Sequence, residues 1–377
     1  MVFEEKLTYE CDNTSKQQED LEILAKSDIE FEKYKNKTVF VTGATGLIGS
    51  FLVKTLLCVN RLNNYNIKVI AAVRNREKAE KLFAGLLNRE EMTLYVSDIV
   101  RPIVIEENID YIFLEIYSNI DLQTIFFHLA ILKMECFLHF SYHRVMTIET
   151  SYQGTRNVLE LARKKNIDGM VYVSSMEIYG VPDEKIENIS EKDLGYIDIG
   201  KVRSGYSEGK RICECLCNAY ASEYEVSVKS ARLAQTFGAG VLENDNRVYV
   251  QFAKSAMEKK DIVLHTKGTS EGNYCYIRDA VKALLMLGYA GKAGEAYNVV
   301  NESTHMQIKE MAMLVADKIA DGNIKVVYDI PNSDIKYGYA PSVKMKLSSD
   351  KLRKLGWQPE VDLEEMYERM IYDMSNR

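Results

Sequence analysis

Lys37-Thr-Val-Phe-Val-Thr-Gly-Ala-Thr-Gly-Leu-Ile-Gly49 joins a short apolar run to a turn that contains three glycines. The run has the length of a buried strand, and residues 47–58 continue with the periodicity of a helix. In such a unit Gly43 permits a tight turn, Gly46 lets a phosphate approach the backbone, and Gly49 lets the helix pack on the strand. The helix N-terminus then faces the anion. The turn therefore predicts a dinucleotide site formed by Gly43, Thr45, Gly46, Leu47, Ile48 and Gly49.

Strands and helices alternate from this turn onward. Buried strands are expected at residues 67–73, 92–96, 169–174 and 226–233, and helices at 76–87, 155–165 and 206–224. This alternation implies right-handed crossovers and a parallel sheet. We therefore expect an α/β fold, in which a Rossmann-like doubly wound parallel sheet over residues 37–235 forms the dinucleotide-binding domain.

Two further parts flank this domain. Residues 236–377 begin with a segment rich in turn residues and continue with short elements. We expect them to form mainly a smaller C-terminal substrate-binding lobe, which also borrows residues 181–204. Residues 1–36 are polar, with a few apolar positions at helical spacing, and predict an N-terminal helical extension that packs on the main body.

The composition excludes several classes of protein. The chain has 377 residues, 46% apolar and 27% charged, so it can bury a sizeable core and is not disordered. Its 55 acidic residues outnumber its 48 basic ones, and the net charge of −7 argues against a nucleic-acid partner. The longest apolar stretch, residues 125–134, is too short to span a bilayer, and we expect no signal peptide and no membrane partner.

The cysteines indicate a reducing compartment. There are seven, an odd number, and no two have the CxxC spacing. Cys213, Cys215 and Cys217 lie two residues apart, which is not a usual spacing for zinc ligands. We therefore expect packed thiols, no metal site and a cytoplasmic location.

The end of the second strand bears on the choice of cofactor. A carboxylate at this position binds the ribose 2′-hydroxyl of NAD, whereas this strand ends in Val73 and Arg74 follows. A guanidinium can pair with a 2′-phosphate that no carboxylate repels, so the cofactor is NAD or NADP, with NADP modestly favoured by Arg74. Alternatively, Arg74 only stacks on the adenine. Asp98 and Ile99, after the third strand, are expected to contact the adenine ring.

Tyr206 and Lys210 lie four residues apart in a predicted helix, so their side chains share one face. The ammonium of Lys210 would stabilise a tyrosinate and lower the pKa of Tyr206, which makes Tyr206 a usable base for a sugar hydroxyl. Ser174 and Ser175 end the preceding strand, where a hydroxyl can bind the same sugar oxygen.

Four segments together resemble the extended short-chain dehydrogenase/reductase family: TGATGLIG at 42–49, SSMEIYG at 174–180, YSEGK at 206–210 and KLRKLGWQP at 351–359. The stretch 203–211 is most similar to UDP-glucuronate decarboxylases and dTDP-glucose 4,6-dehydratases. The resemblance implies a nicotinamide cofactor that oxidises the C4 hydroxyl of a nucleotide-diphosphate sugar and later returns the hydride. It also implies a homodimer, formed through a helix pair that includes residues 206–224.

The same resemblance implies roles for individual residues. Tyr206 would be the catalytic base, Lys210 its pKa partner, Ser175 the oxygen-binding hydroxyl and Glu177 a base at C5. The residues that would line the cofactor are Ser174, Tyr206, Lys210 and Ala130, the last within His-Leu-Ala. Those that would bind the substrate are Gln235, Arg247 and Tyr179.

The sequence departs from the family at three places. Met176 stands where the dehydratases carry the Asp that expels the C6 hydroxyl, and a thioether cannot donate a proton. Tyr339 stands where the decarboxylases carry an arginine, which counts against decarboxylation. Residues 112–147 are irregular, because a strand begins at Ile109 and His-Leu-Ala follows only at 128–130, so this region holds either an insertion or an aberrant segment.

We therefore expect an NAD(P)-dependent, redox-neutral nucleotide-sugar epimerase or 4,6-dehydratase. An NADP-dependent reductase of a keto-sugar or another carbonyl is the first alternative, favoured by Arg74 and disfavoured by Glu177. A non-catalytic dinucleotide sensor is the second. It would account for the irregular region 112–147, but it leaves Ser175, Tyr206 and Lys210 unexplained.

Overall fold

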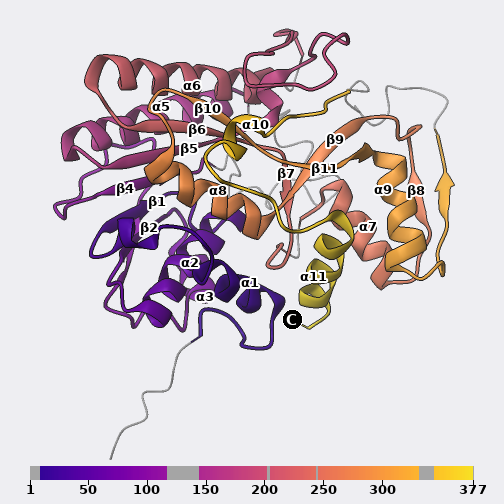
Figure 1. The fold of residues 1–377 in the computed structure, drawn as a ribbon, viewed down its shortest axis with the longest axis horizontal. Helices are drawn as coiled ribbons and strands as arrows, with labels where there is room; N and C mark the ends of the chain where they lie inside the picture. Colours follow the sequence, from indigo (N-terminus) through magenta and orange to yellow (C-terminus); the bar gives the residue numbers. More distant parts are fainter. Residues whose placement is uncertain (1–8, 117–143, 202–203, 243–244, 331–343, 377) are drawn as a thin grey trace, which may run out of the picture.

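The computed structural model describes residues 9–116, 144–201, 204–242, 245–330 and 344–376 (Figure 1). Its main layer is a seven-stranded sheet in the order β10-β6-β5-β4-β1-β2-β3, and every neighbouring pair is parallel. These strands are β1 (Thr38–Val41), β2 (Lys68–Val73), β3 (Met92–Val96), β4 (Tyr111–Leu114), β5 (Gly169–Ser175), β6 (Val228–Leu233) and β10 (Ala296–Val299). The predicted Rossmann-like doubly wound sheet is confirmed.

Helices cover both faces of this sheet (Figure 1). Val39 and Val41 of β1 pack in one core with α2 (Leu47–Asn63) and α8 (Ile277–Ala290), while Phe40 between them packs in the other with α5 (Arg144–Lys165) and α6 (Ser204–Tyr224). Adjacent side chains of a strand point to opposite faces, so a continuous apolar run serves both cores. A short helix, α3 (Arg76–Leu82), joins β2 to β3.

The C-terminal part forms two small sheets beside the main one. β7 (Gln235–Phe237), β9 (Glu271–Tyr276) and β11 (Asn301–Gln307) make a mixed three-stranded sheet, and β8 (Ile262–Leu264) pairs in parallel with β12 (Val326–Tyr328). The helices here are α7 (Val248–Met257), α9 (Ile308–Leu314) with a π-helical continuation (Val315–Ile319), α10 (Asp350–Arg353) and α11 (Leu363–Ser375). Since α8 and β10 return to the main sheet, the chain passes between the two parts more than once after residue 235.

The N-terminal segment is built into the body of the molecule. Its helix α1 (Lys16–Ala25) packs against α2, α8 and α11, and η1 (Phe31–Tyr34) leads into β1. The fully buried carboxylate of Asp20 accepts hydrogen bonds from Tyr276 and Arg278 and forms an ion pair with Arg369, and all three partners belong to the C-terminal half. The segment therefore links α2 of the main sheet to the C-terminal helix.

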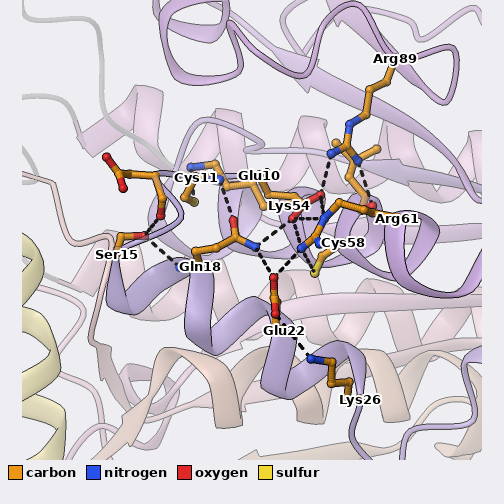
Figure 2. Close-up of polar contacts among 12 residues, drawn as sticks. Glu10, Cys11, Ser15, Gln18, Glu22, Lys26, Lys54, Cys58, Arg61 and Arg89 are labelled. Carbon is orange, nitrogen blue, oxygen red and sulfur yellow. Dashed lines mark hydrogen bonds and ion pairs between the residues drawn. The ribbon is translucent and has the colours of Figure 1, made fainter. Parts of the chain in front are cut away.

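A second ion-pair cluster fixes the start of this segment to α2 (Figure 2). The carboxylate of Glu10 has no exposed surface and accepts from Arg61 at 3.0 Å and from Arg89 at 2.7 Å. Arg61 also donates to Glu22 of α1 at 2.8 Å, and Gln18 donates to Glu10 at 3.0 Å. Every charged group in the cluster thus has an opposite charge or a hydrogen-bond partner.

Two properties of the described part of the chain bear on the class of protein. None of its helices combines the length and the apolar character that a membrane crossing requires. Nor does this part of the chain hold a group of three or more His, Cys, Asp or Glu side chains placed to bind a metal ion.

Candidate active site

The glycine turn connects the carboxyl end of β1 to the N-terminus of α2. Gly43 has a φ of +61°, and a Cβ at Gly49 would lie 2.4 Å from the carbonyl oxygen of Gly43. A Cβ at Gly46, the N-cap residue of α2, would lie 3.2 Å from the same oxygen. Only glycine fits this turn without strain, and backbone N–H groups form its wall. Such a wall fits the phosphates of a dinucleotide. Of the other predicted contacts, Leu47 is buried, and Thr45 and Ile48 are half-buried.

Glu115 directly follows β4 and lies against this turn, a contact that the sequence analysis did not anticipate. Its carboxylate accepts a hydrogen bond from the N–H of Gly49 at 2.9 Å, and its backbone oxygen accepts from the hydroxyl of Thr42 at 2.6 Å. Burial raises the pKa of Glu115 to about 7, although the Gly49 N–H and the charges of Lys210 and Arg247 lower it. The carboxylate therefore lies against the turn, and the charges of Lys210 and Arg247 both act on it.

Tyr206 and Lys210 lie on one face of the first turns of α6, as their spacing predicts. The ammonium of Lys210 is 5.8 Å from the ring centroid of Tyr206 and 5.0 Å from that of Tyr172. It donates a hydrogen bond to the carbonyl oxygen of Val173 at 2.8 Å. Burial lowers the pKa of Lys210, and Cys213 and Glu115 oppose that effect. The ammonium is thus buried beside a half-buried tyrosine.

The serines that end β5 point in different directions, as alternate residues of a strand must. The hydroxyl of Ser174 donates to the carboxylate of Glu214, which lies on α6. Ser175 is half-buried, and its hydroxyl accepts from the N–H of Glu177 at 3.2 Å. Glu177 itself is half-buried in the short helix η3 (Met176–Tyr179). Ser175 and Glu177 therefore remain accessible, whereas the hydroxyl of Ser174 binds within the fold.

Tyr179, expected to bind substrate, is fully buried. Its hydroxyl donates to Asn298 at 2.6 Å and accepts from Arg232 at 3.0 Å. Arg232 in turn pairs with Glu214 at 2.8 Å, so these side chains form one closed network with Ser174. Burial raises the pKa of Tyr179 to about 12. A neutral, fully bonded tyrosine in this position holds β5, β6 and β10 together, and we assign it no substrate contact.

Arg247 and Gln235, the other two residues expected to bind substrate, are placed differently. Arg247 is the N-cap residue of α7, and its guanidinium pairs with Asp245 and lies 4.9 Å from the ring centroid of Tyr249. One third of its side chain remains exposed. Gln235 begins β7 opposite Tyr274 and is half-buried. The positive charge of Arg247 lowers the pKa of Glu115, the carboxylate beside the glycine turn.

The residues expected around the adenine follow the neighbouring strands. Val73 ends β2 and is buried, so no carboxylate occupies that position, and Arg74 after it is exposed. The side chain of Asp98 accepts from the N–H of Val100 at 3.2 Å within its own turn. Ile99 packs against Gly154 of α5, where a Cβ would lie 2.7 Å from it. Ala130, expected to line the cofactor, and Tyr339 lie outside the described residues.

These residues meet at one edge of the main sheet. The glycine turn, Glu115 and Ser175 follow β1, β4 and β5, which are neighbours and parallel. The strand order reverses between β1 and β4, and in open α/β sheets a ligand binds at such a reversal, outside the carboxyl ends of the strands. A separate cavity of about 800 Å³ lies at the β6–β10 edge, and neither Tyr206 nor Lys210 lines it. We therefore place the candidate active site at the reversal.

Comparison with known proteins bears on the family to which the chain is similar. The model of the NAD dependent epimerase/dehydratase family matches residues 124–300, and that of a polysaccharide biosynthesis protein family matches residues 39–178. UDP-glucuronic acid decarboxylase 6 of Arabidopsis thaliana is 28% identical over 331 residues, which cover 88% of this chain and 86% of the relative. UDP-glucuronic acid decarboxylase 1 of Xenopus tropicalis is 26% identical over 337 residues, 89% of this chain and 72% of the relative.

Solved structures show the same fold. An epimerase of Methanothermobacter thermautotrophicus superposes with a TM-score of 0.71 at 23% identity, covering 94% of this chain and 96% of that one. The UDP-glucose 4-epimerase of Thermotoga maritima superposes with a TM-score of 0.68 at 19% identity, covering 90% and 99%. The fold is thus that of a dinucleotide-binding α/β protein. The chain is similar to the NAD-dependent epimerase/dehydratase family of nucleotide-sugar enzymes, the resemblance that its motifs predict.

Proposed function

We propose that this chain binds NAD at the glycine turn and acts on a nucleotide-diphosphate sugar through transient oxidation of its C4 hydroxyl. The observation that carries the proposal is the convergence of the turn with Lys210 and Arg247, whose charges both act on Glu115 beside the turn. A tyrosine–lysine pair and a half-buried serine lie at the same edge of the sheet. This set combines a phosphate site with a base and two cations.

Each residue then has a defined task. The dinucleotide, when bound, supplies a hydride acceptor at C4 and a source for the return of that hydride. Tyr206 takes the proton of the C4 hydroxyl, and the ammonium of Lys210 beside it favours the tyrosinate. Ser175 donates a hydrogen bond to the same sugar oxygen. Arg247, partly exposed at the start of α7, pairs with the diphosphate of the substrate.

The side chain at position 176 selects among the reactions that a C4 ketone permits. Dehydration needs a proton donor for the C6 hydroxyl, and the thioether of Met176 is none. A ketone at C4 lies β to a carboxylate at C6, so carbon dioxide can leave a 4-keto-uronate without an acid at that position. The relatives are named for decarboxylation of UDP-glucuronic acid. Tyr339, in place of the decarboxylases' arginine, counts against decarboxylation, but the likeness to the decarboxylases over most of the chain and the absent acid at position 176 outweigh it. We therefore propose UDP-glucuronate as the substrate and decarboxylation as the reaction, with 4-epimerisation second.

Product masses separate these reactions. The purified protein with NAD is incubated with UDP-glucuronate, UDP-glucose and dTDP-glucose in turn, and each product is weighed by mass spectrometry. We expect loss of carbon dioxide from UDP-glucuronate and little loss of water from the glucose nucleotides. A changed elution time with no change of mass would indicate epimerisation instead. Rapid loss of water from dTDP-glucose would contradict our reading of Met176.

A spectral experiment tests the oxidation step itself. A candidate nucleotide sugar is added to the protein with bound NAD, and the absorbance of the reduced nicotinamide is followed over time. We expect a transient rise that decays as product forms. A non-catalytic dinucleotide sensor would give no transient, and a reductase would consume reduced cofactor steadily.

The preference between NAD and NADP is a finer proposal. Val73 offers no carboxylate to repel a 2′-phosphate, and Arg74 beside it is exposed. We expect NADP to bind as well as NAD or better, and Arg74→Ala to weaken NADP by about tenfold, the effect of losing one charge-assisted contact, while NAD is unaffected. Calorimetric titration with both dinucleotides measures this. Tighter binding of NAD that is insensitive to Arg74→Ala would refute the preference.

We also propose that the chain is a cytoplasmic homodimer. The outer face of α5 carries an exposed apolar stripe at helical spacing, with Val145 at 69%, Ile148 at 43% and Tyr152 at 37% exposure. Ile212 on the adjacent α6 is 45% exposed. A second copy that packs the same helix pair would cover this stripe. The free thiols of the described cysteines support a reducing compartment.

A further inference from the structure

The carboxylate of Glu115 lies where the phosphates of a dinucleotide would bind. Its Oε2 accepts from the N–H of Gly49, the third residue of α2, at 2.9 Å. A Cβ at Gly46 would lie 3.5 Å from each of its carboxylate oxygens, and one at Gly43 would lie 3.1 Å from its Cβ. The side chain thus crosses the glycine turn and offers its own negative charge to the helix N-terminus.

The backbone on either side fixes Glu115 in this position. The hydroxyl of Thr42, at the end of β1, donates to the carbonyl oxygen of Glu115 at 2.6 Å, and the N–H of Thr42 donates to Phe113 in β4 at 3.0 Å. Ile116 after it is buried, near Gly154 of α5. Glu115 itself is 8% exposed. A buried acidic side chain held between β1 and α5 has few directions open to it other than the turn.

The groups that face this carboxylate define its electrostatics. Gly49 of α2 contributes an N–H, and Lys210 of α6 and Arg247 before α7 contribute positive charges. The first turn of α2 carries no acidic residue, and the neutral hydroxyl of Thr42, after β1, donates to the backbone oxygen of Glu115. Two cations and one helix N-terminus therefore attract a single negative charge, and a dinucleotide that enters brings at least two more.

We propose that Glu115 is a competitor built into the dinucleotide site, and that the cofactor binds tightly only when this carboxylate is neutral or has moved out of the turn. The proposal rests on the proposed NAD site. With Glu115 ionised, carboxylate and phosphates compete for the same N–H groups and repel each other at close range. With Glu115 protonated, both can lie against the turn. The chain thereby gains a dinucleotide affinity that falls as the pH rises.

The size of the effect follows from the fraction of binding-competent protein. The pKa of Glu115 is raised to about 7, mainly by burial, so the neutral form falls from most of the protein to a small minority between about pH 6 and about pH 8. Apparent affinity scales with the competent fraction, so NAD should bind about tenfold more weakly at the higher pH. The affinity for NAD falls as the pH rises because Glu115 must take up a proton before NAD binds tightly.

Calorimetric titration of NAD at both pH values, in two buffers of different ionisation enthalpy, tests the proposal with the full chain. The parent should show the tenfold loss and take up a proton on binding at the higher pH. Glu115→Gln keeps the shape without the charge, and Glu115→Ala removes the group. Both variants should bind NAD about tenfold more tightly than the parent at about pH 8, with little pH dependence and no proton uptake. Glu107→Gln, an exposed carboxylate at the opposite end of β4, is the matched control and should behave as the parent.

Two outcomes overturn the proposal, and they are distinguishable. If the parent and both Glu115 variants bind NAD with the same affinity at both pH values, the dinucleotide site stands and Glu115 is not its competitor. If the parent, the control and both Glu115 variants all fail to bind NAD at either pH, the proposed function is wrong. The proposed role of Glu115 as a competitor is then wrong as well. Circular dichroism of each variant confirms that it is folded.

Discussion

Tyr206 and Lys210 are the two side chains on which the proposed chemistry depends. The ammonium of Lys210 has one carbonyl oxygen and two aromatic rings around it, and burial lowers its pKa. Burying a cation in this way costs desolvation free energy in the folded protein. A role in activating Tyr206 would explain why the fold retains it. The pair is therefore better explained as a base and its activator than as a packing contact.

Replacing the base gives the first prediction. Tyr206→Phe keeps the ring and removes the proton acceptor, so turnover should fall by about 10²-fold or more, the usual scale for a general base. Binding of NAD should stay within a few-fold of the parent. Tyr328→Phe, on an exposed strand far along the chain, serves as control. Turnover near the parental rate would show that Tyr206 is not the base.

Met176 gives the second prediction. It is half-buried, packs against Ile178 and Tyr179, and is followed by the half-buried Glu177. Met176→Asp supplies the missing proton donor beside a carboxylate that can act at C5. On a glucose nucleotide it should raise 4,6-dehydration by about 10²–10⁴-fold if the acid reaches the C6 hydroxyl. The assay is the appearance of the dehydrated product. Fast dehydration by the unmodified chain would mean that another group is the acid.

At the scale of single elements, α1 is the one whose role the ion pairs define. Burial alone would raise the pKa of Glu10, but hydrogen bonds from Arg61, Gln18 and Arg89 outweigh it and hold that pKa below its ordinary value. The stabilisation is thus fully present above the ordinary pKa of a glutamate and is lost as the pH falls through the lowered value. The cluster fixes α1 to α2 (Figure 2). The ion pair of Asp20 with Arg369 joins α1 to α11, so α1 is a structural brace between the two helices.

Removing that charge gives the third prediction. Glu10→Gln leaves Arg89 without its carboxylate and should lower the free energy of unfolding at neutral pH by about 3 kcal/mol, the low end for breaking a buried pair. The loss should shrink in acid, because the parent also loses the charge there. Glu80→Gln breaks the exposed pair with Arg76 and should cost less than about 1 kcal/mol. Equal denaturation midpoints for parent and Glu10→Gln would refute the brace.

Short sequence patterns predicted the helices and strands that an apolar run or a turn motif marks within one segment of the chain. The strand at 92–96 has the predicted bounds, and the helix that follows the glycine turn begins at residue 47 as predicted but ends at residue 63 and not at 58. Helix α8 was not predicted, although Arg278, Asp279 and Lys282 stand among its apolar residues at helical spacing and mark a helical period. Helix α5 begins at residue 144, earlier than the predicted 155. Its first turns were missed because they carry exposed apolar residues, which obscure the amphipathic pattern of a surface helix.

The candidate site divides in the same way. The glycine turn and the Tyr206–Lys210 pair depend on spacing within one segment, which the sequence displays directly. Glu115 was missed because its contact with Gly49 requires β4 to lie beside β1. The acidic residue directly after the apolar run of β4 was the signal in the sequence that could have suggested a contact between Glu115 and the glycine turn. The alternation of strand residues could likewise have separated Ser174 from Ser175.

For the whole molecule, the sequence predicted a parallel sheet but not the full order of its strands. Alternating strands and helices fix a parallel sheet. The return of α8 and β10 to that sheet, after a long excursion through the C-terminal part, depends on contacts between distant segments. Residues 181–204 illustrate the same point, because Ile189 bridges to Leu347 near the other end of the chain.

The fourth prediction concerns assembly. Ile148→Glu places a charge on the exposed stripe of α5 and should convert a homodimer to a monomer, because a buried uncompensated charge costs several kcal/mol. Val104→Glu, at 69% exposure and before β4, is the control and should leave the dimer intact. Light scattering during size-exclusion chromatography measures both. A parent that is monomeric at micromolar concentration would refute the dimer.

In the proposed cycle the dinucleotide is first the oxidant and then the reductant of the same substrate molecule. The most direct measurement is the number of UDP-glucuronate molecules converted for each NAD supplied, with NAD far below the sugar nucleotide in concentration. We expect many product molecules, lighter by carbon dioxide, for each NAD, with no reduced dinucleotide accumulating. Product in a one-to-one ratio with a dinucleotide that changes its redox state would contradict the account and favour a reductase.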